Sequence, residues 1–257
     1  MADNVQTTLS HYPLHLDKRP TPKRIGLILL ATDHTTERDF ARLLSPDEVG
    51  VYCTRIAFEN PTSRENLKKT GPRLTEATAK ILPGEELDAI VYSCTSASVV
   101  LGNDVVEGHI KAAKPGATCI TPSSAAIKAF NALNAKRISI MTPYTAEVTD
   151  ELVSYFIANG LDIISSTCLG MQDDRDMARL SHASIIETAI AAMDPTADAL
   201  FISCTALRGA ECVGRIEDKI GKPVITSNQA MIWSTLQHLR LKPKIEGAGS
   251  IFELLGS

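Results

Sequence analysis

Aromatic residues and positive charge are both scarce in this sequence. Aromatic side chains make up 5% of the 257 residues, and 26 Lys and Arg against 30 Asp and Glu leave a formal net charge of −4. A nucleic-acid partner requires a basic field that attracts phosphates, and single strands also need aromatic rings on which bases stack. The composition therefore excludes a nucleic-acid partner.

Long apolar runs are also missing. The longest are short, such as Ile25–Ala31 and Ala199–Ile202, whereas a membrane-spanning helix needs roughly 20 apolar residues. The first residues, Met1 to Arg24, are polar and contain no apolar signal core. We therefore expect a cytoplasmic protein with no membrane partner and with a flexible leader over residues 1–23.

Motifs for metals and cofactors are absent as well. No CxxC pair or Cys/His cluster has the spacing of a zinc site, and no GxGxxG or GxxxxGK[ST] loop is present to bind a nucleotide. No lysine has a context typical of pyridoxal phosphate. We expect no metal and no cofactor. The six cysteines are expected to be free thiols, because a chain of this length needs no disulfides in a reducing cytosol.

Short apolar runs are present instead, and they alternate with longer helical stretches. The run Arg24–Leu30 is uninterrupted, which is typical of a buried parallel strand. Helices are predicted over Arg64–Leu82, ending at Pro83-Gly84, and over Ala146–Asn159, ending at Gly160. Further strands are expected at Val49–Ala57, Leu87–Tyr92, Ala117–Ile120, Arg137–Met141, Asp162–Ser166, Ala199–Ile202 and Pro223–Ile225. The alternation indicates an α/β fold with parallel sheets covered by helices.

An internal repeat runs through this pattern. The sequence Ser-Cys-Thr-Ser at 93–96 recurs as Ser-Cys-Thr-Ala at 203–206, each time after an apolar strand, so Cys94 and Cys204 are 204 − 94 = 110 residues apart. Looser echoes follow in the same order, of 24–28 at 137–141 and of 119–123 at 224–228. The repeat predicts two similar lobes related by a pseudo-twofold axis, with the active site in the cleft between them. We assign residues 24–125 and 226–257 to the first lobe and 126–225 to the second.

The two Cys-Thr turns follow strands, at the sheet edge where ligands bind in parallel α/β folds. If a helix begins after each turn, its unpaired N–H groups point at the thiol, lower the thiol pKa and cradle a carboxylate. Cys94 and Cys204 could then act as acid and base on opposite faces of one carbon. A thiolate could instead add to an electron-poor alkene.

The alternative for any free cysteine is a small buried core residue. The repeated context favours chemistry for Cys94 and Cys204. The other four, Cys53, Cys119, Cys168 and Cys212, lack that context, and we expect them to be core residues.

Four segments together resemble one branch of the aspartate/glutamate racemase superfamily. They are IVYSCTS at 90–96, MTPY at 141–144, SCTALR at 203–208 and KPVITSNQ at 222–229. That branch contains maleate cis–trans isomerases and arylmalonate decarboxylases. The segment Ala31–Phe40, ATDHTTERDF, most resembles its ectoine-utilisation racemase-like subgroup. The resemblance covers roughly residues 22 to 240.

The resemblance implies roles for the matching residues. Cys94 and Cys204 match the thiols of the two halves, and decarboxylases of this branch carry a glycine at the first, so a pair of thiols favours racemisation or isomerisation. Tyr144 matches a tyrosine whose hydroxyl reaches the site, and the loop 32–36 matches one that binds the far end of the substrate. The expected substrate contacts are Asp33, His34, Thr95, Ser96, Tyr144, Asp174, Thr205 and Ala206.

Two departures from the maleate isomerase pattern concern charge. Asparagines expected in the first-strand loop and before an Ala-Arg-like segment are replaced here by Asp33-His34 and by Asp173-Asp174. Carboxylates there would repel a dicarboxylate and attract an ammonium group. These acids could instead be solvated or cap helices. His34 could be a general base or a loop residue bonded to the backbone.

The sequence thus predicts a cofactor-independent racemase or isomerase of a small carboxylate-bearing substrate, such as an amino-acid derivative or a cis-dicarboxylate like maleate. Two alternatives stay open. One is a decarboxylase in which Cys204 alone reprotonates a carbanion, and the other is a small-acid-binding protein without chemistry. The expected partners are the small carboxylate and other copies of the chain, in a dimer or tetramer.

Overall fold

The apolar runs of the sequence form two parallel sheets of four strands each. They are seen in a computed structural model, in which residues 7–245 and 248–255 are described. The first sheet has the order β2-β1-β3-β4, with β1 at Lys23–Leu30, β2 at Val49–Ile56, β3 at Ala89–Ser93 and β4 at Thr118–Ile120. The second has the order β6-β5-β7-β8, with β5 at Arg137–Thr142, β6 at Asp162–Cys168, β7 at Ala199–Ile202 and β8 at Val224–Thr226.

The two sheets are equivalent in topology. Every pair of neighbouring strands is parallel, and the second sheet repeats the strand order of the first. The α/β fold with parallel sheets flanked by helices is therefore confirmed. The matching order is what a duplicated unit produces.

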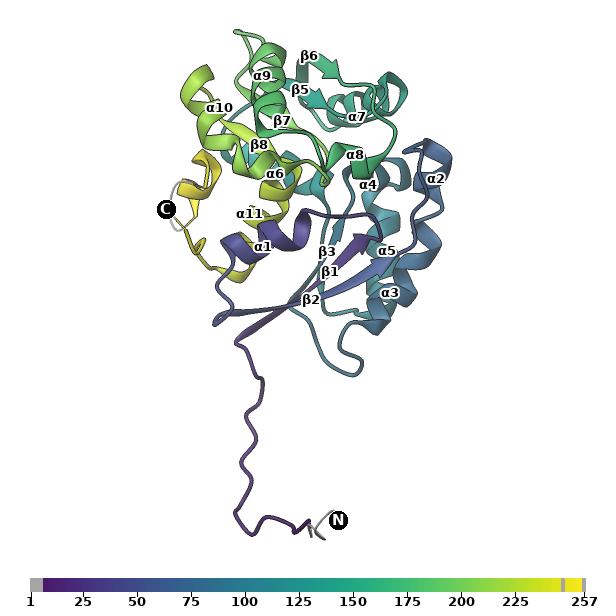
Figure 1. Ribbon diagram of the computed structural model, residues 1–257, viewed down its shortest axis with the longest axis vertical. Coiled ribbons are helices and arrows are strands. Elements are labelled where there is room, and N and C mark those ends of the chain that lie inside the picture. Colours follow the sequence, from purple (N-terminus) through teal and green to yellow (C-terminus); the bar gives the residue numbers. More distant parts are fainter. Residues whose placement is uncertain (1–6, 246–247, 256–257) are drawn as a thin grey trace, which may run out of the picture.

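Helices cover both faces of each sheet (Figure 1). On the first sheet, α3 (Leu74–Lys80) and α5 (Asn103–Ala113) pack together and against its strands, while α1 (Thr36–Leu43) packs on α11 (Ser227–Leu239). On the second sheet, α9 (His182–Ala192) and α10 (Val213–Ile220) pack together, and α7 (Ala146–Ala158) contacts β6. The short helices α2 (Arg64–Lys68) and α4 (Thr95–Leu101) pack on each other, and α4 also contacts α7.

Two helices join the lobes. The helix α6 (Pro122–Ala132) follows the last strand of the first sheet but packs on β8, whereas α11 follows β8 and contacts β3, β4 and β8. The two helices pack against each other, and one buried apolar cluster runs through both of them into β1, β3, β5 and β7. Burial of this cluster fixes the two sheets to each other and thereby places their carboxyl ends.

One predicted helix is wrong. Residues 64–82 form α2, a 3-10 turn at Gly71–Arg73 and then α3, rather than one continuous helix. Pro72 at the start of the 3-10 turn has no N–H to donate, so the helical hydrogen-bond ladder cannot continue through it. The predicted strands and the helix ending at Gly160 (φ +84°) agree with the structure to within about two residues.

The segment before β1 projects from the body as an extended arm (Figure 1, purple). Residues 7–22 contain neither helix nor strand, and most of them are exposed. Residues 1–6 of the expected leader, and residues 246–247 and 256–257 of the expected first lobe, lie outside the described residues. Within the described ranges, no helix has the length and apolarity to cross a membrane.

Candidate active site

The two Cys-Thr turns occupy equivalent places at the carboxyl ends of β3 and β7. Cys94 directly follows β3 and is the N-cap of α4. Cys204 lies just after β7, but no α-helix begins there: a turn leads to a 3-10 segment at Arg208–Glu211, and α10 starts only at Val213. The expectation of a helix after each thiol therefore holds for Cys94 and is wrong for Cys204.

The backbone at Cys204 explains this difference. Its φ is +94°, a conformation that a residue with a side chain adopts only at a cost of about 1–3 kcal/mol. The reversal turns the following backbone back toward the sulfur, so that the Ala206 N–H donates to Cys204 Sγ at 3.3 Å. Strain of this kind persists only where the surrounding structure imposes it, and it is common at functional sites.

Both thiols line one cavity between the lobes. The cavity is small, with a volume of about 20 Å³. Cys94 and Cys204 are both free and nearly inaccessible, with 4% and 7% of their surface exposed. The first lobe contributes Leu30, Asp33, Phe58, Thr62, Leu67, Cys94 and Ser96, and the second contributes Tyr144, Asp174, Met177, Cys204, Thr205 and Ala206.

Burial makes both thiols weaker acids than usual. Desolvation raises the pKa of Cys94 to about 11 and that of Cys204 to about 12. The Ala97 and Ala206 N–H groups act in the opposite direction, but loss of water is the larger effect. The expectation that the turns lower the thiol pKa is therefore wrong. A charge on Cys94 also raises the pKa of Cys204, so a single thiolate is favoured over two.

Ser227, at the start of α11, links the two turns. Its Oγ accepts a hydrogen bond from Thr95 Oγ1 at 2.8 Å and another from the Cys204 N–H at 3.1 Å. Thr95 is buried and points into this link, and it is not among the residues lining the cavity. One serine thus connects the side chain of the residue after Cys94 to the backbone of Cys204.

Asp174 lies in the cavity wall, where two loops from different lobes meet. Its Oδ1 accepts from Asn60 Nδ2 at 2.9 Å and its Oδ2 from Thr32 Oγ1. The Thr62 N–H donates to the Gln172 oxygen at 2.7 Å, which joins the same two loops again. Asp173, not Asp174, caps α8 (Asp174–Met177) by accepting from the Arg175 N–H. Asp174 is therefore buried at the site rather than used as a cap.

The first-strand loop is arranged by Asp33. Its Oδ1 accepts from the N–H groups of Thr35 and Thr36 at 2.9 Å, and its Oδ2 accepts from Thr36 Oγ1 at 2.7 Å. Burial nevertheless raises the pKa of Asp33. Asp33 thus both shapes the turn before α1 and lines the cavity. His34 is exposed and is not among the lining residues.

The remaining expected residues surround the thiols. The Tyr144 hydroxyl accepts from Ser203 Oγ at 3.4 Å, and its interaction with Cys204 lowers the pKa of that thiol, against burial. Ser96 Oγ is 3.8 Å from Cys94 Sγ. Thr205 and Ala206 continue the wall beyond Cys204.

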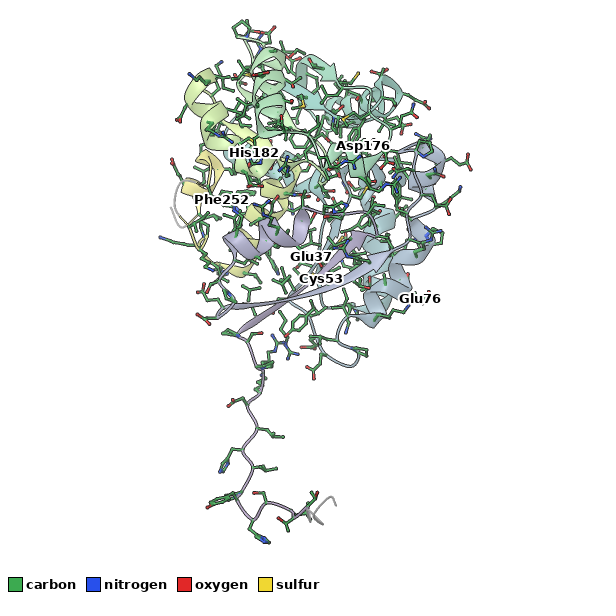
Figure 2. The ribbon with its side chains drawn as sticks, viewed as in Figure 1. Glu37, Cys53, Glu76, Asp176, His182 and Phe252 are labelled. Atoms are coloured by element: carbon green, nitrogen blue, oxygen red, sulfur yellow. The ribbon has the colours of Figure 1, made fainter. Side chains whose placement is uncertain are left out.

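The other four cysteines lie outside the cavity. Cys212 is buried and Cys119 is half-buried, but Cys53 and Cys168 are exposed, so the expectation of a core position is wrong for these two. Cys53 is on β2 and Cys168 is on β6, and both strands lie at the outer edges of their sheets, where side chains face solvent. Figure 2 shows Cys53 next to Glu37 on the surface near β2.

Several residues of the site were not predicted from the sequence. Thr62 and Asn60 lie in a loop with no motif, and the apolar wall of Leu30, Phe58, Leu67 and Met177 has no signal beyond hydrophobicity. Ser227 lies within the resembling segment 222–229 and could have been found there. In the described part of the chain, no group of three or more His, Cys, Asp or Glu side chains is placed to hold a metal ion.

The fold and the site together define the class of this protein: a two-lobed α/β protein in which a pair of cysteines lines one cavity between the lobes. A family model described as arylmalonate decarboxylase matches residues 65–252, so the chain belongs to the arylmalonate decarboxylase family.

Relatives of known activity match nearly the whole chain. The maleate isomerase of Geobacillus stearothermophilus is 24% identical over 242 residues, covering 89% of this chain and 96% of the relative. The maleate isomerase of Pseudomonas putida is 26% identical over 242 residues, with coverages of 89% and 96%. The fold also matches a cysteine-to-serine mutant of the Nocardia farcinica maleate cis–trans isomerase with a covalently bound succinylcysteine intermediate, at a TM-score of 0.80 and 22% identity over 91% of this chain and 99% of that one.

Proposed function

We propose that this protein is a cofactor-independent isomerase or racemase of a small carboxylate-bearing substrate, with Cys94 and Cys204 as its acid/base pair. The observation that carries the proposal is that both thiols, at equivalent positions of two sheets, line the same cavity. Maleate isomerases among the relatives support an isomerase. The family as a whole supports chemistry at a carbon next to a carboxylate.

In the proton-transfer route, one cysteine is a thiolate and the other a thiol. The thiolate removes the proton from the carbon beside the substrate carboxylate, and the C–H electron pair passes into an enediolate. The opposite thiol then donates its proton to the other face of that carbon, which inverts the centre and leaves the cysteines with exchanged protonation. Ser96, Thr205 and Tyr144 line the same cavity, and we infer that their hydroxyls donate hydrogen bonds to the enediolate oxygens.

In the addition route, the substrate is an alkene conjugated to a carboxylate. The thiolate forms a C–S bond at one alkene carbon while the electron pair of the double bond moves toward the carboxylate. Rotation about the resulting single bond and expulsion of the thiolate give the other geometric isomer. A succinylcysteine intermediate in the Nocardia farcinica enzyme supports this route for that relative.

Decarboxylation is the second candidate, favoured by the family model itself. A decarboxylase would need only Cys204, which would protonate the carbanion left by departing carbon dioxide. Cys94 would then be a wall residue of the cavity. The strained backbone at Cys204 is compatible with either role, whereas the buried thiol at Cys94 has a use in the proton-transfer and addition routes and none in decarboxylation.

The experiment that tests the proposal is a panel of small chiral acids, conjugated cis-alkenoic acids and substituted malonates incubated in deuterium oxide. The expected result for at least one compound is either inversion with deuterium wash-in beside the carboxylate or cis–trans conversion, which needs no wash-in. Release of carbon dioxide from a malonate, without exchange in any other compound, would replace the proposal by decarboxylation. Absence of all turnover would favour a binding protein.

We further propose that the protein works in the cytoplasm as a homo-oligomer and belongs to the ectoine-utilisation racemase-like subgroup. Six free cysteines support a reducing compartment. The extended arm supports self-association, because Leu9, Tyr12, Leu14 and Leu16 are each at least 84% exposed. The segment Ala31–Phe40 carries the subgroup resemblance.

A further inference from the structure

We propose that the substrate carries an ammonium group as well as its carboxylate, and that Asp174 and Thr62 bind this ammonium group. The inference rests on the proposed function, because it concerns the same cavity. It narrows the substrate from any small acid to an amino-carboxylate.

The charge of the cavity is the first argument. Two buried carboxylates, those of Asp33 and Asp174, line it, and no Lys, Arg or His is among its lining residues in the described part of the chain. Arg55 is close to Asp33, but its Nη1 donates to the Leu30 and Asp33 main-chain oxygens and its Nη2 to Glu37. A second carboxylate of the substrate placed beside Asp174 would therefore meet like charge with no cationic side chain in the cavity wall, whereas an ammonium group would be attracted.

The hydrogen bonds of Asp174 leave room for a cation. Its two oxygens accept from the amide of Asn60 and the hydroxyl of Thr32, both of them neutral donors. A carboxylate offers about four lone-pair sites, so each oxygen can accept once more. On the same segment, Asp173 and Asp176 form ion pairs with Arg175 and Arg179. In the described residues, Asp174 has no such ion pair, although it is the buried member of the three.

Thr62 supplies an independent argument. Its side chain is 6% exposed and lines the cavity, yet its Oγ1 has no hydrogen-bond partner. A buried hydroxyl without a partner is destabilising, and a ligand atom in the cavity is the partner it lacks. The Thr62 N–H is bonded to the loop that leads into Asp174, so hydroxyl and carboxylate are held on adjoining loops. An ammonium group can donate to both at once.

Part of the remaining wall is apolar, like the body of such a molecule. Leu30, Phe58, Leu67 and Met177 form an apolar surface in the same cavity. Methylene groups between the ammonium and the reacting carbon would lie against these side chains. The thiols and their neighbouring hydroxyls are then left for the carboxylate end.

The test compares four acids with the same number of carbons: butyrate, succinate, 2-aminobutyrate and 4-aminobutyrate. Their dissociation constants are measured by calorimetry on the wild-type protein, on Asp174→Asn and on Thr62→Val. The expected result is that at least one amino acid binds roughly 10- to 100-fold more tightly than succinate, the effect of one charge-assisted hydrogen bond. Asp174→Asn should remove that preference. Thr62→Val should weaken the binding of the amino acid but not that of butyrate.

Asp176→Asn is the matched control. Asp176 lies on the same helix, is half exposed on the surface (Figure 2) and is not among the residues that line the cavity. Its replacement by Asn removes the same charge as Asp174→Asn does. It should leave all four affinities unchanged. Thermal unfolding of each variant shows whether it is folded before binding is measured, and Thr62→Val, which keeps the charge and shape of the wall, serves if Asp174→Asn is unfolded.

Tighter binding of succinate than of both amino acids, or equal losses in Asp174→Asn and Asp176→Asn, would overturn the proposal. So would failure of both amino acids to bind at their solubility limit. Binding needs no turnover, so these outcomes are separate from those that decide the proposed function. An amino-acid preference in a protein that inverts nothing would retain the ammonium site and reject the two-thiol chemistry.

Discussion

At the scale of single residues, the account depends on two thiols that are hard to ionise. Their pKa values of about 11 and 12 exceed that of an ordinary cysteine, because burial disfavours the thiolate. At pH 7 the more acidic of them would be ionised in roughly one free molecule in ten thousand, since each pH unit below the pKa lowers the thiolate fraction tenfold.

This gives a prediction for pH. Because the active form is the thiolate, kcat/KM should rise about tenfold per unit from pH 7 to pH 10, with no plateau in that range. The measurement is kcat/KM against pH for a substrate found in the panel, with the protein shown to be folded throughout. A profile that is flat from pH 7 to pH 9 would mean that the reacting thiol has a pKa below 7, contrary to the burial argument.

At the scale of secondary-structure elements, the start of α11 positions the chemistry. Ser227 accepts hydrogen bonds from both Cys-Thr turns. Ser227→Ala would leave the Cys204 N–H and the Thr95 hydroxyl buried without partners. We expect a loss of about 1–3 kcal/mol in the free energy of unfolding for the unpaired groups, measured by denaturant titration.

In the same variant, kcat should fall by a larger factor than substrate affinity, because misplaced thiols affect the reaction rather than binding. Ser154→Ala, at an exposed position on α7, is the matched control and should match the wild type in both measurements. Unchanged stability and unchanged kcat in Ser227→Ala would show that the turns hold their positions without this link.

Another contact of α11 predicts how stability varies with pH. Asp39 on α1 is buried and accepts from Asn228 Nδ2 at 2.7 Å, and burial raises its pKa to about 6. The folded state then holds a proton that the unfolded state has released between about pH 4 and pH 6, so stability is lost as pH rises through that window. The loss amounts to about 3 kcal/mol at neutral pH.

Asp39→Asn keeps an acceptor for Asn228 and cannot ionise. We expect its free energy of unfolding, relative to the wild type, to increase between pH 4 and pH 7 by up to that amount. Denaturant titrations of both proteins at several pH values provide the check. A constant difference between the two would contradict the raised pKa.

The elements also show what the sequence could predict. Apolar runs locate each strand because buried parallel strands have no polar alternation, and the repeated Ser-Cys-Thr locates the site because duplication repeats it. The helical spacing of residues 64–82 gives no sign of the interruption at Gly71-Pro72, although Pro72 itself is the residue that breaks the helix. The turn at Cys204 and the closure of Asn60 and Thr62 onto the loop before Asp174 depend on contacts between the lobes, which no local pattern encodes.

At the scale of the whole molecule, we propose that residues 24–125 and 226–257 form the first lobe and residues 126–225 the second. The last segment belongs to the first lobe because α11 returns the chain to β3 and β4. The exposed apolar arm before the first lobe gives a further prediction. The full chain should sediment as a dimer or tetramer, and replacement of Tyr12, Leu14 and Leu16 by Ser should shift it to a smaller species. If the full chain and the variant sediment identically, the arm is not part of the interface between subunits.

The central claim is that Cys94 and Cys204 act together on one substrate carbon. The most direct measurement is net inversion or cis–trans conversion, scored separately from deuterium wash-in, for Cys94→Ala, Cys204→Ala and the surface control Cys53→Ala. We predict that each cavity variant loses net conversion by at least about a thousandfold, since one face of the carbon then has no acid or base, while Cys53→Ala retains wild-type activity. Exchange of the proton of a single enantiomer in one of the two variants is compatible with the account. Full net conversion in Cys94→Ala would contradict the account.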